Sequence, residues 1–141
     1  DLLFLYYAFC DCKRAACVSG VGYHYLQNSG NSSTTPYITI PRAESYKVTA
    51  KIVSNCKSRG GSLEKAAVHR HIVHTYALLS RVMRSKNNEY AEKYFPVYKK
   101  EILKYKNQIF CGGEYSFKQK AGTFALLLGD KVFLKYFANK N

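Results

Sequence analysis

The sequence SLEKAAVHRHIVHTYALLSRVMRS, from Ser62 to Ser85, decides the fold of this chain. It begins with a serine that is a credible N-cap, directly after Gly60-Gly61, a pair that ends the preceding element. The spacing of its apolar residues predicts one long helix that continues to about Ser85. The residues expected to face inward are Ala66, Val73, Tyr76, Ala77, Ser80 and Met83.

Another helix is predicted on the N-terminal side of this segment. Pro41 stands where the first turn of a helix tolerates proline, and residues 42–58 follow it with apolar side chains at helical spacing. Five residues fall on one face of this helix: Tyr46, Thr49, Ala50, Val53 and Cys56.

Two further helices are predicted on the C-terminal side. The first covers residues 89–108, is expected to bend or split at Pro96, and is closed by Gly112-Gly113. The second starts near Tyr115, with Gly129-Asp130 as a candidate interruption. Its expected inner stripe is Phe117, Ala121, Phe124, Leu128, Phe133, Tyr136 and Phe137.

Four helices joined by short loops predict a mainly α fold, a small helical bundle over residues 37–141. Residues 1–36 have a different character. An apolar helix is expected over residues 2–9, followed by two short strands at residues 15–18 and 23–26. Strands this short do not form a stable sheet alone, so this region is expected to be a short α/β remnant of something larger.

Composition points to a folded, strongly basic protein. The chain has 141 residues, 47% of them hydrophobic, which is enough for a real core and too much for a disordered tail. Lys and Arg number 22 against 9 Asp and Glu, giving a formal net charge of +13. A positive field of this size favours anionic partners such as nucleic acid, phosphate esters or an anionic membrane surface.

The cysteines and the hydropathy add exclusions. Five cysteines lack the paired C-x-x-C spacing of a zinc site, and their odd number favours buried thiols in a reducing compartment. No apolar run approaches the roughly 18 residues of a membrane span. The expected location is therefore cytoplasmic, including the inner face of the membrane.

The first 34 residues carry a pattern with functional content. Asp1 opens the apolar run Leu2-Leu3-Phe4-Leu5-Tyr6-Tyr7, and the triplet Tyr23-His24-Tyr25 leads into a polar loop over residues 27–34. This order resembles the closing segment of the catalytic domain in family-2 glycosyltransferases of the GT-A type. There a Glu-Asp pair starts a helix, and a strand ending in Tyr-x-Tyr is followed by a loop that carries Ser. The Glu of that pair is absent from this chain.

The resemblance implies that residues 1–36 end a glycosyltransferase catalytic domain and that residues 37–141 are its helical C-terminal extension. The intact enzyme would transfer a sugar, with inversion, from a nucleotide-sugar donor to a glycan or lipid-linked acceptor, such as a cell-envelope polysaccharide. It would use a divalent cation, Mn or Mg. In the family the donor-binding half and its Asp-x-Asp motif lie upstream of the matched segment. The chain alone is therefore expected to be inactive and to hold no cofactor.

The same resemblance assigns the candidate site. Asp1 is implied to be the general base that deprotonates the acceptor hydroxyl, and its alternative role is an N-cap carboxylate. His24 is implied to bind the metal or the diphosphate, with a structural histidine at a strand end as the alternative. The implied substrate loop, which packing and turn chemistry also explain, is Tyr23, Tyr25, Ser29, Asn31 and Ser32.

Three histidines in the long central helix do not form a metal motif. His69, His71 and His74 lack the H-E-x-x-H arrangement and a third ligand, although His71 and His74 are spaced to share a face. Together with Arg70 they are predicted to form a wet, basic helix face.

Lysines and aromatic residues interleave at residues 93–95, 98–100, 104–106 and 135–137. This pattern suits a lipid headgroup layer, although aromatic residues that form a core stripe beside solvated lysines explain it equally. No recognised nucleic-acid module is visible, so specific nucleic-acid recognition is not expected. The alternative function is a non-enzymatic basic helical module that binds an anionic membrane or nucleic acid.

Overall fold

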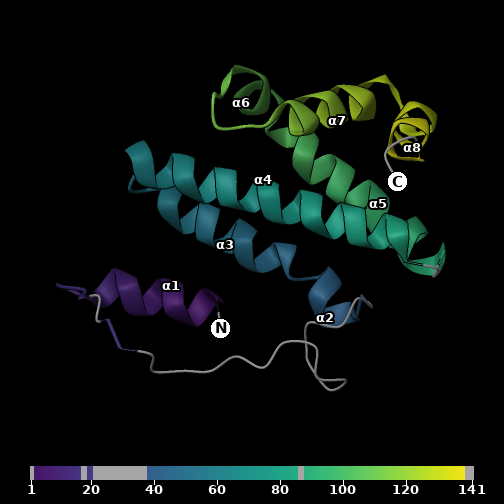
Figure 1. Ribbon diagram of the computed structural model, residues 1–141. Coiled ribbons are helices and arrows are strands. Elements are labelled where there is room, and N and C mark those ends of the chain that lie inside the picture. Colours follow the sequence, from purple (N-terminus) through teal and green to yellow (C-terminus); the bar gives the residue numbers. More distant parts are fainter. Residues whose placement is uncertain (1, 17–18, 21–37, 86–87, 139–141) are drawn as a thin grey trace.

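The computed structural model describes residues 2–16, 19–20, 38–85 and 88–138, and Figure 1 shows that these are mainly helical, as predicted. The described residues contain no strand: residues 15 and 16 of the first expected strand are irregular, and residues 23–26 of the second lie outside the described part. The helices are α1 Leu2–Asp11, α2 Ile40–Ala43, α3 Tyr46–Lys57, α4 Gly61–Arg84, α5 Asn88–Lys104, α6 Lys106–Cys111, α7 Phe117–Leu128 and α8 Asp130–Ala138.

The helices pack in a series. The main contacts join α1 to α3, α3 to α4, α4 to α5, α5 to α7 and α7 to α8, and α6 packs on α7. In Figure 1, α1 lies on one side of the α3–α4 pair, and α7 and α8 lie on the opposite side. The side chains that are almost completely buried between these layers include Ile72, Leu79, Tyr98, Ile102 and Leu126.

The helix predicted over residues 42–58 is divided into α2 and α3. Glu44 and Ser45 form a turn between them, and the Ser45 hydroxyl donates to the Arg42 carbonyl over 2.6 Å. Such a bond from a serine side chain to the preceding turn competes with a continuous helix. The predicted inner stripe of α3 is confirmed, since Thr49, Val53 and Cys56 are its buried residues.

Helix α4 ends one residue before the predicted limit, and its predicted inner stripe is right only in part. Tyr76 and Met83 pack against the core. Ala66 and Ala77 are exposed. The buried residues of α4 are Val68, His71, Ile72, Thr75, Leu78, Leu79 and Val82. Large aliphatic side chains remove more apolar area from water than Ala or Ser, so they decide which face turns inward. The predicted cap at Ser62 is also wrong, because α4 follows Gly60, which lies at a φ of 60°, and no side chain caps it.

Helix α5 runs through Pro96, so the expected split at this residue is wrong. The break comes instead at Tyr105, where φ is −109° and ψ is 18°. The Tyr105 ring is buried and meets the ring of His71 with 5.8 Å between centroids. The break thus coincides with the packing of this ring against α4, nine residues beyond Pro96.

Helices α7 and α8 are separated as expected at Gly129, which has a φ of 127°. At the other end of α7, Ser116 and Gln119 form a reciprocal capping box. The predicted inner stripe is wrong for Phe117, Phe124 and Leu128 of α7, which face solvent. It is confirmed for Phe133, Tyr136 and Phe137 of α8, which belong to the core or pack against it. The buried residues of α7 are Gly122, Thr123, Ala125 and Leu126.

The buried face of α7 packs against Tyr76 of α4, which also forms hydrogen bonds to α7. A Cβ on Gly122 would lie 3.5 Å from the Tyr76 ring. The Tyr76 hydroxyl donates to the Gln119 carbonyl over 3.0 Å and contacts the Thr123 hydroxyl at 2.5 Å. These hydrogen bonds favour the rotation of α7 that turns Gln119 and Thr123 toward α4.

Candidate functional site

All residues that the resemblance assigns to the site lie outside the described part of the chain. These residues are Asp1, Tyr23, His24, Tyr25, Ser29, Asn31 and Ser32. Their roles therefore remain predictions. Within the described residues, three features have functional interest: a buried polar network, the surface of α1, and the surface formed by α7 and α8.

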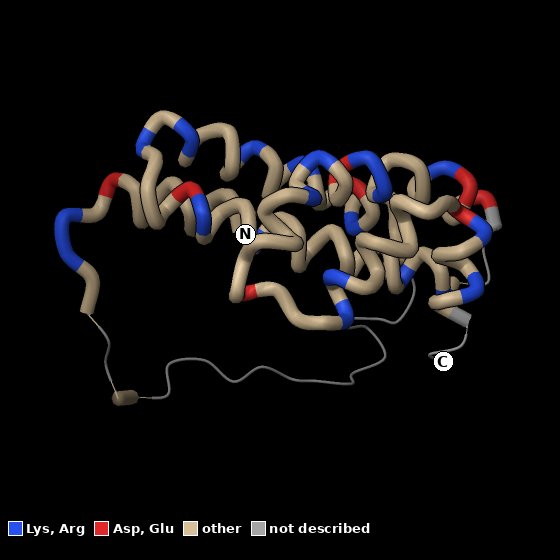
Figure 2. Tube along the Cα trace, turned by 90° about the horizontal axis from the view of Figure 1, so that it is seen from above, with Lys and Arg blue, Asp and Glu red and all other residues tan. Residues whose placement is uncertain are grey.

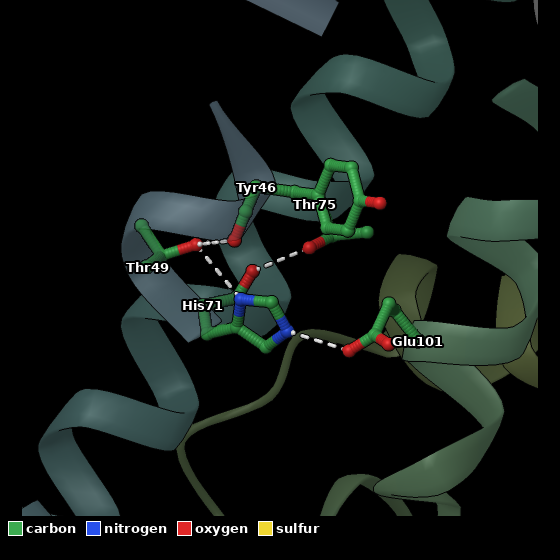
Figure 3. A network of polar contacts seen from close by, with 5 residues as sticks. All are labelled: Tyr46, Thr49, His71, Thr75 and Glu101. Carbon is green, nitrogen blue, oxygen red and sulfur yellow. Dashed lines mark hydrogen bonds and ion pairs between the residues drawn. The ribbon is translucent and has the colours of Figure 1, made fainter. Parts of the chain in front are cut away.

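The buried network joins three helices through His71 (Figure 3). Its Nδ1 lies 2.8 Å from Thr49 Oγ1 of α3, and its Nε2 lies 3.3 Å from Glu101 Oε2 of α5. The Thr75 hydroxyl of α4 donates to the His71 carbonyl over 2.8 Å. Because only 1% of His71 and 2% of Thr49 is exposed, these groups hold helices together and do not meet a substrate.

Burial also fixes the protonation of this histidine. It lowers the pKa of His71 against the opposing effect of Glu101, so the imidazole is neutral at pH 7. Its Nε2–H then donates to Glu101, and its Nδ1 accepts from the Thr49 hydroxyl. The same Thr49 hydroxyl donates to the Tyr46 carbonyl over 2.9 Å, and its oxygen can accept from Nδ1 if that atom takes a proton. The hydrogen bonds thus survive protonation, and desolvation is what opposes it.

The prediction of a wet histidine face is wrong for His71, which is buried, and holds only in part for His74. His74 is half-buried, and its Nε2 lies 2.8 Å from Ser45 Oγ. Burial and the nearby Arg70 lower the pKa of His74. Both histidines face α3, as their spacing indicated, so they form the polar part of the α3–α4 contact.

Helix α1 exposes most of its apolar surface. Phe4 is 74% exposed and Phe9 is 64% exposed, and no residue of α1 is buried. The helix is attached to α3 through Tyr6, whose hydroxyl lies 3.5 Å from Cys56 Sγ, and through Tyr7, which accepts from Asn55 over 3.0 Å. A groove of about 510 Å³ separates α1 from α3 and α4.

Helices α7 and α8 expose both apolar and basic side chains. Phe117 is 83% exposed, Leu128 is 59% exposed and Phe124 is 57% exposed. Four lysines follow within the same two helices: Lys118, Lys120, Lys131 and Lys135. On α5 and directly after it, the aromatic residues beside lysines, Tyr94, Tyr98 and Tyr105, are buried core, which confirms the alternative of a core stripe there.

Basic residues are not confined to one helix. Figure 2 shows Lys and Arg distributed along the whole described tube, with few acidic residues among them. No group of three or more potential ligands gathers into a metal site within the described residues. Across the same residues, no helix has the length and apolarity needed to cross a membrane.

Comparisons with known proteins give no match: no family model, no curated protein and no solved structure is similar to this chain at a significant level.

Proposed function

We propose that this chain is the C-terminal part of an inverting glycosyltransferase that uses a nucleotide-sugar donor and a glycan or lipid-linked acceptor. In this proposal Asp1 is the general base, His24 contacts the metal or the diphosphate, and Tyr23, Tyr25, Ser29, Asn31 and Ser32 belong to the substrate loop. A divalent cation would be held mainly by upstream residues and would neutralise the diphosphate of the leaving group.

The observation that carries the proposal is helix α1. It begins at Leu2, directly after Asp1 in the sequence, which is the order that the resemblance requires. A carboxylate at a helix N-terminus is held ionised by the helix dipole, and an ionised carboxylate is what a general base needs.

The surface of α1 supplies a second argument. Five of its large side chains are at least 40% exposed: Leu2, Phe4, Leu5, Tyr7 and Phe9. Contiguous apolar surface of this kind marks a place where other protein packs. Leu2, Leu5 and Phe9 line the groove that faces α3 and α4, whereas Phe4 does not line it. A catalytic domain would enter this groove and cover Phe4.

The test is the release of nucleoside diphosphate from a panel of nucleotide sugars, with Mn or Mg, by the protein expressed from its full reading frame. The Asp1→Asn variant is expected to lose at least about 100-fold in rate, since a positioned general base contributes about that much or more. Asp11→Asn is the matched control, because Asp11 is an exposed carboxylate at the other end of the same helix. Equal rates for Asp1→Asn and the unmodified protein would refute the proposal.

The 141-residue chain alone is proposed to have no transferase activity. Sugar transfer by this chain in isolation would contradict the proposed division between donor-binding and C-terminal parts. The second candidate function is binding to an anionic surface without catalysis, and the net charge of +13 supports it. A binding module would show no nucleotide-sugar turnover and no dependence on Asp1.

A further inference from the structure

Helix α7 carries an apolar stripe on the side opposite its packed face. Phe117, Phe124 and Leu128 are spaced seven and then four residues apart, which places them in one row along the helix. The buried Gly122 and Leu126 lie on the other side, against the bundle. Leu127, 43% exposed, extends the row. We call these four exposed residues the α7 stripe.

Lysines accompany this stripe on α7 itself and on the adjacent helix α8. Lys120 lies three residues after Phe117 and four before Phe124, so it lies beside the row. Lys118, Lys131 and Lys135 are exposed on the same two helices. The one acidic residue between Phe117 and Lys135 is Asp130, whose carboxylate pairs with Lys99 of α5 at 2.5 Å. The local charge is therefore strongly positive.

Helix α8 continues this composition. Its buried residue is Phe133, and Val132 and Leu134 on either side of it are each 43% exposed. Aliphatic side chains next to exposed lysines thus occur on both helices. Helices that lie in the headgroup layer of a membrane have this composition, with Phe and Leu entering the acyl boundary and Lys meeting lipid phosphates.

We propose that α7 and α8 form a docking surface for an anionic lipid bilayer, in which the α7 stripe inserts at the headgroup boundary and the four lysines contact lipid phosphates. This proposal does not depend on the transferase activity proposed above. Insertion of the α7 stripe into the headgroup boundary needs no change in the fold, because α7 keeps its buried face and its capping box.

Two other occupants fit the surface less well. A second copy of the chain would bring two sets of lysines together, and like charges in an interface oppose association. Nucleic acid would use the lysines, and Phe117 and Phe124 could stack on bases. Leu127 and Leu128 have no such use, whereas the acyl boundary of a bilayer accommodates both.

The test is co-sedimentation of the 141-residue chain with vesicles of phosphatidylcholine, with and without phosphatidylglycerol, at low and at roughly physiological salt. Binding is expected with phosphatidylglycerol and weak without it. Phe117→Ser combined with Phe124→Ser is expected to weaken binding at least about tenfold. Neutralising the lysines with Lys118→Gln and Lys131→Gln is expected to reduce both the affinity and its salt dependence.

Phe4→Ser combined with Phe9→Ser is the matched control, because it removes two exposed phenylalanines from α1 and leaves the lysines intact. This variant is expected to bind vesicles like the unmodified chain. Circular dichroism checks that each variant is folded. Sedimentation velocity and an oligonucleotide titration, run on the same variants, test the other two occupants.

Three results would overturn the proposal. The folded chain fails to bind anionic vesicles, or the α7 variant binds them unchanged, or the α1 control loses binding as strongly as the α7 variant. Self-association or oligonucleotide binding that depends on Phe117 and Phe124, without vesicle binding, would overturn it in favour of a second copy or nucleic acid.

Discussion

Helices α1 and α7 both present large apolar side chains to solvent, but they differ in what they bury and in the charges around them. Helix α7 has a buried face with Leu126, a capping box at Ser116 and lysines beside its exposed stripe. Helix α1 has no buried residue, and its one charged side chain is Asp11. Exposed apolar area alone therefore does not identify a partner. The neighbouring charges suggest lipid for α7 and protein for α1.

The strongest prediction separates the two faces of α7. Leu126→Ala is expected to lower the free energy of unfolding by about 2–5 kcal/mol, because it opens a cavity at a fully buried position. Leu128→Ala, on the exposed stripe, is expected to change it by less than about 0.5 kcal/mol. Urea denaturation measures both. Similar losses for the two variants would mean that the α7 stripe is buried in solution.

Acid is expected to loosen α1 and α3 before α7. Burial holds the pKa of His71 and His74 below the ordinary value of 6.5, so the unfolded chain binds protons more readily than the folded one. Their contribution to stability is complete above that value and is lost as the pH falls below it. Arg70 and Lys104 favour the neutral rings, while Glu101 opposes this for His71.

Amide hydrogen exchange at several pH values, corrected for intrinsic rates, measures this difference. Protection in α1 and α3 should fall first, because α1 packs on α3 and the histidines face α3. His71→Gln should flatten the pH dependence of unfolding, with His69→Gln as the control on the same helix. Loss of protection in α1 and α7 at the same pH would contradict the prediction that acid loosens α1 before α7.

The capping box gives a smaller, local test. Ser116→Ala removes the side chain that accepts from the Gln119 amide, so α7 should lose about 1 kcal/mol of stability. Ser62→Ala is the matched control, since no side chain caps the start of α4. Thermal unfolding followed by circular dichroism compares the two variants. An equal loss of stability in Ser62→Ala would mean that Ser62 caps α4, as the sequence predicted.

The smallest effect is expected on the exposed face of α1. Phe4→Ser combined with Phe9→Ser should change the free energy of unfolding by no more than about 0.5 kcal/mol per substitution, because both rings are mostly exposed already. The same variant should stay monomeric at higher concentration than the unmodified chain, as analytical ultracentrifugation can show. A large loss of stability would indicate that these rings are covered within the chain itself.

The sequence was sufficient for the long helices, but not for the breaks at Ser45 and Tyr105 or for the orientation of the helices. The main helices could be predicted from the glycines at positions 60 and 129 and from the apolar spacing between them. The inward face of α7 includes Thr123, whose hydroxyl bonds that of Tyr76, a contact between residues 47 positions apart that no local pattern contains. Burial of His71 likewise depends on Thr49 and Glu101, which lie on other helices.

The candidate site was predicted from a short pattern around Asp1 and His24. Such a pattern can be recognised because catalytic chemistry limits the types and spacing of residues. The exposure of a side chain sets no such limit on the sequence. The two exposed apolar surfaces were not predicted. Phe117, Phe124 and Leu128 form an apolar row that suits a core as well as an exterior partner. Tertiary packing decides whether such a row lies in the core or faces an exterior partner.

The serial packing of the helices has a consequence for how the chain folds. Most pairs of helices in contact are near neighbours in the sequence, so their association closes only short loops. Proteins with such local contacts fold rapidly, since little chain entropy is lost before contacts form. The α3–α4 hairpin can therefore assemble while later helices are still being synthesised, and each new helix finds its docking surface already in place.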